Sequence, residues 1–361
     1  MSSKHVPSLN GLRAISIVFV IIGHIGYRSF NWADSPGGQL GVNVFFIVSG
    51  FLITMLMLDE ENLNGKVNLK KFYARRAFRI FPPLYFLLLT YGLLQLAGVL
   101  HFHINSWITS LTYTKYFPIR NGTEWESDHL WSLSVEEHFY LLWPFIFMFL
   151  KPYRVKIAWL IILVIPIIRG INFWNGHEAQ NAEGTIFHRA DALMMGCLLA
   201  IYRKRITEWM SRVIEKNKLM IFLPAAGLFF TIVVLKVISL RLNNPVEGAV
   251  IRALGRSTGT FTCIFECLAI VISISFTNNM WYQFLNNGVM NYIGKLSYSL
   301  YLWQQLFFSH QIGLLSKFPI NVFCIFAVAV FSYHLIEKPF LKIKSKFEVR
   351  RISQRVTPQA A

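Results

Sequence analysis

The chain has 361 residues, of which 54% are hydrophobic and 15% are charged, and its mean hydropathy is +0.45. A soluble domain of this length carries about 25% charged residues, so the composition excludes an ordinary soluble protein and favours a polytopic membrane protein. The net charge of +17 invites a nucleic-acid interpretation. Its distribution along the chain, described below, indicates membrane topology and no nucleic-acid partner.

Apolar segments recur from end to end and predict an all-α polytopic membrane protein with about ten transmembrane helices. The first segment lacks the small-residue cleavage site of a signal peptide, so we interpret it as a retained span. The predicted spans are 11–29, 40–58, 80–100, 130–150, 157–171, 186–202, 219–240, 258–276, 292–311 and 318–336.

The basic residues predict the orientation of these spans. An even number of spans puts both termini on one side of the membrane, and cytoplasmic segments carry an excess of Lys and Arg. With a cytoplasmic N-terminus, most of the 35 basic residues fall in cytoplasmic segments, among them 66–79, 151–156 and 203–218. We therefore expect both termini in the cytoplasm, a transmembrane domain over 1–341 and a basic cytoplasmic tail over 342–361, with no soluble domain appended.

The first span carries two basic groups, Arg13 and His24. They are eleven residues apart, an offset of three turns plus roughly 20°, so both side chains leave one helix face about 16 Å apart along its axis. Taken alone, Arg13 fits an anchor that snorkels to the cytoplasmic interface. His24 lies about 18 Å along the span, and an ionisable group at that depth in a membrane indicates a functional site.

The second span, "GVNVFFIVSGFLIT", contains Gly41 and Gly50 together with Asn43 and Ser49. Small residues let transmembrane helices approach each other closely. We expect these positions to serve helix packing.

Three arginines in "FYARRAFRIFPPLY", Arg75, Arg76 and Arg79, precede two prolines. Proline suits the first turn of a helix, so Pro82 and Pro83 predict that the arginines precede or begin the third span. Guanidinium groups can bind a polyphosphate through bidentate hydrogen bonds. Positive-inside charge in contact with anionic lipid is the alternative.

The longest predicted outer segment, 101–129, is rich in Trp, Tyr and polar residues. It can bind a sugar by stacking or form an interfacial aromatic belt, and the sequence leaves both open.

The segment "DHLWSLSVEEHFYLLWP" opens the fourth span from the outer side. His129, Ser132, Glu136 and Tyr140 are spaced by three and four residues and share one helical stripe. A carboxylate in a membrane needs a partner, so Glu136 is expected to face the protein interior. Glu136 then has either a structural role, as a hydrogen-bond partner of another helix, or a catalytic role.

The depths of Glu136 and His24 coincide. Glu136 lies about 10 Å inward from the outer boundary and His24 about 18 Å outward from the inner one, in a hydrocarbon core of about 30 Å. A carboxylate and an imidazole at one level can form an acid–base pair in which the carboxylate orients the ring. The hypothesis is a His24–Glu136 pair, although helix neighbours do not follow from one sequence.

Four cysteines lie within apolar runs. Cys263 and Cys267 are four residues apart and can share a helix face, but they lack the nearby His or carboxylate partners of a metal site. We expect no metal.

Seven motifs, in the same order along the chain, resemble the membrane acyltransferase-3 family. The resemblance extends over roughly 8–341, and the first and fourth motifs are the most specific. The motifs are "LNGLRAISIVFVIIGH", "GVNVFFIVSGFLIT", "FYARRAFRIFPPLY", "WSLSVEEHFYLLWP", "RADALMMG", "IGKLSYSLYLWQ" and "EKPF".

The resemblance implies about ten helices and O-acylation of a carbohydrate, commonly with acetyl-CoA from the cytoplasm. It implies catalytic roles for His24 and Glu136. It also implies a donor-binding role for basic residues on two segments, which are Arg13, Arg75, Arg76 and Arg79. A glutamine often stands where this chain has His138, two places after Glu136. Some family members add an SGNH esterase-like domain, which we do not expect here.

The prediction is an O-acyltransferase of the bacterial inner membrane with no tightly bound cofactor. Its expected partners are acetyl-CoA or another acyl-CoA, an extracytoplasmic or lipid-linked carbohydrate, and membrane lipids; the oligomeric state is open. His24 either deprotonates the acceptor hydroxyl or carries the acyl group transiently, while Ser132 and Tyr140 bind acceptor or stabilise the oxyanion. The alternative is a transporter of lipid-linked sugar in which His24 and Glu136 relay protons.

Overall fold

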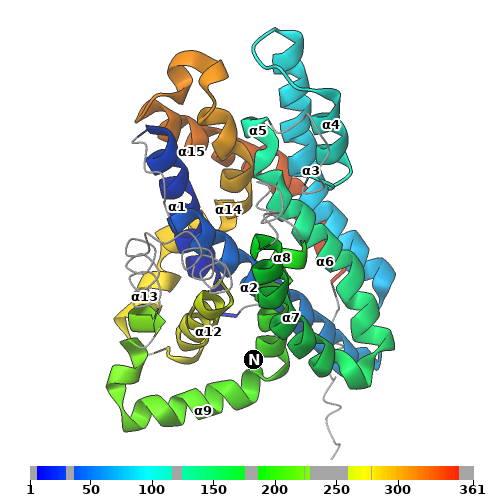
Figure 1. Cartoon of the computed structure of the whole chain (residues 1–361), viewed down its shortest axis with the longest axis vertical. Coiled ribbons are helices and arrows are strands. Elements are labelled where there is room, and N and C mark those ends of the chain that lie inside the picture. Colours follow the sequence, from blue (N-terminus) through cyan, green and yellow to red (C-terminus); the bar gives the residue numbers. More distant parts are fainter. Residues whose placement is uncertain are drawn as a thin grey trace, which may run out of the picture.

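The computed structural model of the chain describes residues 6–29, 36–115, 124–174, 186–222, 224–227, 259–277 and 279–348. The regular elements within these ranges are helices, which confirms the predicted all-α class (Figure 1). The α-helices are α1 (Leu9–Ser29), α2 (Pro36–Asn64), α3 (Leu69–Leu96), α4 (Ile104–Leu111), α5 (Trp125–Asp128), α6 (Leu130–Phe149), α7 (Arg154–Trp174), α8 (Ile186–Ile201), α9 (Arg203–Lys216), α12 (Gly259–Ser275), α13 (Met280–Asn286), α14 (Gly288–Phe307), α15 (Ile320–Ser332) and α16 (Lys338–Ser345). Short 3-10 helices are η1 (Lys151–Tyr153), η3 (Lys218–Phe222) and η4 (His310–Ser316), and η5 (Tyr333–Glu337) is a π-helix.

Several of the described helices are long and apolar enough to cross a membrane. Five meet this condition, and the bent pair α12–α13 makes a sixth if it counts as one span. The five are Leu9–Arg28, Gly38–Asn64, Leu69–Leu96, Lys151–Asn172 and Ile320–Ser345. The predicted count of ten is therefore not reached within the described ranges. The predicted spans 130–150, 186–202 and 292–311 are helices α6, α8 and α14, but α8 has only 16 residues and the other two carry polar stripes. Most of the predicted span 219–240, and the tail beyond 348, fall in parts of the chain that the structure does not describe.

Large apolar side chains on the outside of the bundle identify the lipid-facing surface. On α3, Leu89 is 60% exposed and Leu93 58%, and on α7 Leu160 and Leu163 are 60% and 62% exposed. Soluble monomers rarely expose contiguous apolar patches of this kind. Several apolar spans and an apolar exterior together make this a multi-pass membrane protein.

Helix α2 is the centre of the bundle, with its most extensive contacts to α8 and α1. The α2–α8 contact depends on glycines on both sides. A Cβ atom at Gly50 would lie 2.0 Å from the carbonyl oxygen of Leu193, and one at Gly196 would lie 2.1 Å from that of Ile47. Even alanine would clash with backbone at these positions. The expected packing role of Gly50 is confirmed.

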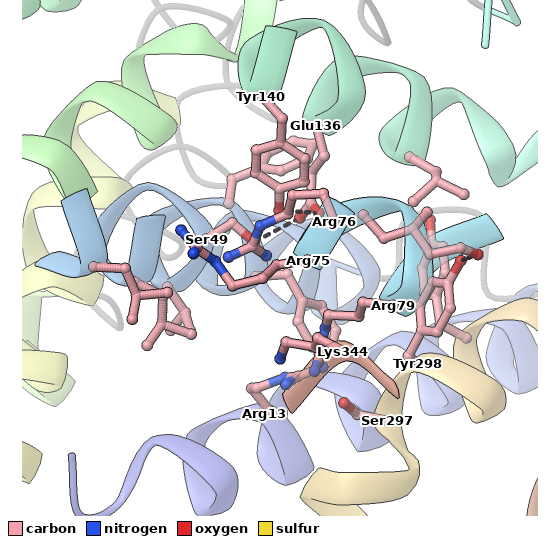
Figure 2. A pocket seen from close by; sticks show the side chains of 18 of the residues that line it. Arg13, Ser49, Arg75, Arg76, Arg79, Glu136, Tyr140, Ser297, Tyr298 and Lys344 are labelled. Carbon is pink, nitrogen blue, oxygen red and sulfur yellow. Dashed lines mark hydrogen bonds between the residues drawn. The ribbon is translucent and has the colours of Figure 1, made fainter. Parts of the chain in front are cut away.

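Helix α3 corrects the prediction that Pro82 and Pro83 lie in a first helical turn. The helix begins at Leu69 with Asn68 as its N-cap, so the prolines lie in its interior. Proline is tolerated inside membrane helices where neighbouring groups satisfy freed backbone carbonyls. Close to the prolines, the Tyr298 hydroxyl donates to the carbonyl of Ile80 at 2.8 Å and joins α3 to α14. As a consequence, Arg75, Arg76 and Arg79 lie on the helix itself, on the side that lines a pocket (Figure 2).

The two ends of the bundle differ. Helices α4 and α5 lie at one end, whereas α9 lies across the other (Figure 1). Within α9, Met210 and Ile214 are buried, while Lys204, Arg205 and Trp209 are exposed. The segment was predicted only as a basic connection. The structure makes it an amphipathic helix.

Candidate active site

A cavity of about 700 Å³ opens between α1, α2, α3, α6 and α14. Its lining brings together seven of the eight predicted site residues, from three helices far apart in the sequence (Figure 2). These seven are Arg13, Arg75, Arg76, Arg79, Ser132, Glu136 and Tyr140. The eighth, His24, is not part of the described lining.

One of the predicted arginines is already paired. The Arg75 guanidinium donates to the Glu60 carboxylate at 2.9 Å and to the backbone carbonyl of Phe347 at 3.0 Å. Both members of the ion pair are buried, with Arg75 7% and Glu60 2% exposed. Arg75 therefore ties α3 to α2 and to the segment after α16. Its donors are engaged before any ligand binds.

The other arginines of the cavity lack such partners. Arg13, Arg76 and Arg79 form no ion pair with a described acidic residue. Arg76 stacks over the Tyr140 ring, with Cζ 5.2 Å from the ring centroid, and its Nε is buried without a hydrogen-bond partner. A buried guanidinium without a partner is costly unless a ligand supplies one.

A further cation, Lys344 of α16, joins this group. It lines the same cavity, and Figure 2 shows it beside Arg13 and Arg79. Lys344 interacts electrostatically with Arg76 and Arg79, and Arg13 with Arg79. Like charges repel most strongly where water is excluded, so the cluster favours an anionic occupant.

Glu136 faces the cavity from α6, as the sequence predicts, and both of its carboxylate oxygens are engaged. The Ser49 hydroxyl donates to Oε1 at 2.9 Å, and the Tyr140 hydroxyl donates to Oε2 at 2.7 Å. The cations that act on this carboxylate are Arg13 and Arg76. Glu136 thus belongs to the arginine end of the cavity.

One turn before Glu136 on α6, a short hydrogen-bond chain connects α6 to α14. Ser132 Oγ and the Tyr301 hydroxyl lie 2.5 Å apart, and the Tyr301 hydroxyl donates to the backbone carbonyl of His129 at 2.9 Å. Both Ser132 and Tyr301 line the cavity. Their hydroxyl groups form a polar part of the cavity wall.

His24 lies outside the described lining, next to Gln304 of α14. Its Nδ1 is 3.1 Å from Gln304 Oε1, and the Trp125 ring meets the imidazole edge-on, with centroids 5.6 Å apart. Gln304 follows Tyr301 on α14 by three residues, about 4.5 Å along the axis. The hypothesis of a His24–Glu136 pair does not describe this geometry, because each side chain bonds to other partners. Glu136 lines the cavity, whereas His24 is not part of its described lining.

Comparison with known proteins explains why these residues are found together. Residues 6–334 match a protein family described as an acyltransferase domain. The chain belongs to this acyltransferase family. The membership confirms the resemblance that the seven motifs indicate.

The O-acetyltransferase OatA of Staphylococcus aureus strain NCTC 8325 is 28% identical to this acyltransferase over 94% of the chain. OatA of strain MRSA252 shows the same identity and coverage. The chain spans 58% of the length of these relatives. No solved structure gave a significant match.

Sequence reasoning missed several residues of the candidate site. Lys344 lies in the segment that the sequence predicts only as a basic cytoplasmic tail, and Ser49 is expected only to serve packing. A stripe on α14 carried a readable signal, because Ser297, Tyr301 and Gln304 recur at helical spacing in "SYSLYLWQQ". What the spacing does not show is which neighbouring helix this stripe faces.

Proposed function

We propose that this acyltransferase moves an acetyl group from cytoplasmic acetyl-CoA to a hydroxyl of an extracytoplasmic or lipid-linked carbohydrate. The arginine cavity binds the CoA phosphates, and His24 lies at the level of the reaction. The named relatives are O-acetyltransferases, which supports acetyl as the acyl group and oxygen as the acceptor atom.

The observation that carries the proposal is a group of three guanidiniums, Arg13, Arg76 and Arg79, that form no ion pair with any acidic residue the structure describes. Coenzyme A presents a diphosphate and a 3′-phosphate, and arginine binds phosphate oxygens through paired N–H donors. Lys344 adds a fourth cation to the same wall. Arg75, by contrast, shapes the site through Glu60 rather than binding phosphate.

The lining of the cavity supports a route for the thioester. The same cavity is lined by Lys344, Glu136, Ser132 and Tyr301. A pantetheine arm extending along this path carries the acetyl group to within one helical turn of Gln304, the residue bonded to His24.

The proposed reaction uses His24 as a general base. Nε2 of His24 takes the proton of the acceptor hydroxyl while the hydroxyl oxygen attacks the thioester carbonyl. The new C–O bond forms, the C–S bond breaks, and the proton passes to the departing sulfur to give free CoA. Ser132 and Tyr140 bind the acceptor or the carbonyl oxygen, and Glu136 keeps Tyr140 and Arg76 in place.

The topology belongs to the same proposal. About ten spans, with both termini in the cytoplasm of a bacterial inner membrane, put α9 and the arginine end of the cavity on the CoA side. Helices α4 and α5 then face the acceptor, which agrees with their position at the end opposite α9 (Figure 1).

The test measures binding and transfer with purified protein in lipid nanodiscs. Calorimetry with CoA is expected to show binding that weakens at least about tenfold in Arg79→Gln, since a charged hydrogen bond contributes about 1.5–3 kcal/mol. Arg205→Gln removes an exposed arginine on α9 and serves as the matched control, with unchanged affinity.

Transfer is followed with labelled acetyl-CoA and a panel of bacterial glycans. Label on the glycan that depends on His24 supports the function. Sugar flux that depends on His24, without label transfer to any acceptor, overturns it in favour of a transporter.

A further inference from the structure

The hydrogen bond between His24 and Gln304 bears on which nitrogen of the imidazole ring carries the proton. Gln304 Oε1 has no proton, so at the 3.1 Å contact the His24 Nδ1–H group donates to it. A neutral imidazole carries one N–H only. Nε2 is therefore left with a free lone pair, which is what a general base or an acyl carrier needs.

The surroundings of the ring restrict it to this position. Gln304 is fully buried, at 0% exposed. Trp125 meets the imidazole edge-on with centroids 5.6 Å apart, and the Phe308 ring lies 6.1 Å away by the same measure. A ring packed between two aromatic side chains and one amide has little freedom to rotate, so the amide determines which nitrogen keeps a free lone pair.

The residue that would hold such a histidine in many enzymes is a carboxylate, but the structure assigns Glu136 elsewhere. Ser49 and Tyr140 donate to Glu136, and its cationic neighbours are Arg13 and Arg76. An amide orients the ring without bringing a negative charge beside it.

Two other titratable groups face His24. Arg28, on the next turn of α1, acts on the ring electrostatically and stacks over Trp125, with Cζ 3.9 Å from the centroid. His129 also interacts electrostatically with His24, and its Nδ1 and Nε2 contact Gln305 Oε1 at 2.8 Å and the Leu302 carbonyl at 3.1 Å. Neither offers His24 an acceptor.

We propose that Gln304 is the positioning residue of His24, holding it in the Nδ1–H tautomer so that Nε2 faces the reacting hydroxyl. This inference rests on the proposed function for its catalytic meaning, but its structural content is independent of activity. In this proposal Gln304, and not Glu136, orients the imidazole ring of His24.

Nitrogen-15 NMR of the full chain in nanodiscs, with labelled histidine, tests the tautomer directly. His24→Asn identifies the His24 signals by their loss. We expect a protonated Nδ1 and an unprotonated Nε2 in the wild type, and loss of this preference in Gln304→Leu. A protonated Nε2 in the wild type, or an unchanged tautomer in Gln304→Leu, overturns the proposal.

Kinetics then separate positioning from a merely structural role. Gln304→Leu is expected to lower kcat at least about 100-fold, the usual contribution of a positioned base, with the KM for acetyl-CoA nearly unchanged. Gln304→Glu also accepts from Nδ1–H, so it restores kcat. Because its carboxylate favours the imidazolium, the acid limb of the pH profile moves to higher pH. Equal loss in both variants, or an unshifted profile in Gln304→Glu, contradicts the proposal.

Gln305→Leu is the matched control, because it removes the equivalent bond to His129 and none to His24. It tests whether loss of a buried amide, or altered titration of His129, gives the same effect; an equal loss of kcat in Gln305→Leu counts against Gln304. A fully active His24→Asn would reject His24 as the base and hence the proposed function, while the NMR result for Gln304 stands on its own.

Discussion

Arg75 and Glu60 form a buried ion pair, 2.9 Å between Nη2 and Oε2, one residue away from an arginine that has no ion-pair partner among the described residues. The neighbours Arg75 and Arg76 therefore have different roles despite identical chemistry. Arg75 closes the cavity wall by joining α3 to α2. The half-buried Arg76 points its guanidinium into the cavity, where Tyr140 supports its face.

Arg75→Ala is expected to destabilise the protein by about 3–5 kcal/mol, because it leaves the Glu60 charge buried and unpaired. Glu60→Gln should cause a loss of the same sign. The measurement is denaturant unfolding in detergent followed by tryptophan fluorescence. An Arg75→Ala protein that unfolds at the wild-type midpoint while losing CoA affinity would assign Arg75 to the ligand instead.

Arg79→Gln and Arg76→Gln should behave in the opposite way. Neither breaks an ion pair, so the unfolding midpoint should stay close to that of the wild type or rise slightly as repulsion within the cluster is relieved. The KM for acetyl-CoA should rise at least about tenfold, for the loss of charge-assisted hydrogen bonds. The KM for acetyl-pantetheine, which has no CoA phosphates, should not change. A parallel rise for both donors would contradict phosphate binding.

His24→Ala and Glu136→Ala are each expected to abolish acetyl transfer, for different reasons. His24→Ala removes the base and should cost about 10²–10⁴ in kcat with CoA affinity retained. Glu136→Ala removes the acceptor that orients Ser49 and Tyr140 and also the negative charge that acts electrostatically on Arg13 and Arg76. CoA affinity should therefore change in Glu136→Ala only. Calorimetry and transfer assays on both variants check this difference, and identical profiles would count against it.

The sequence predicts which residues line the cavity better than it predicts which of them contact each other. Seven of the eight site residues line one cavity because helical spacing and depth determine which face and level each occupies. Spacing predicts that Ser132, Glu136 and Tyr140 share a face, and they do. It carries no information on which helix packs against that face.

The His24–Glu136 hypothesis shows where sequence reasoning ends. Two groups at equal predicted depth can still bond to different partners. Here α14 supplies Gln304 to His24. Helix α3 gives a second case. Proline preference favours a first turn, but in the packed bundle α3 continues through both prolines. Both outcomes depend on tertiary neighbours.

The contact of α2 with α8 gives a prediction that does not depend on function. Gly50→Ala should destabilise the protein by several kcal/mol or prevent its folding, because the new methyl group would lie 2.0 Å from the Leu193 carbonyl oxygen. Gly38→Ala is the matched control in the same helix, since nothing lies within 4 Å of its Cβ position. Alanine is the better helix former by about 0.5–1 kcal/mol, so Gly38→Ala should be neutral or stabilising. Thermal unfolding of both variants in one detergent measures the difference, and equal midpoints would mean that α2 and α8 do not approach through Gly50.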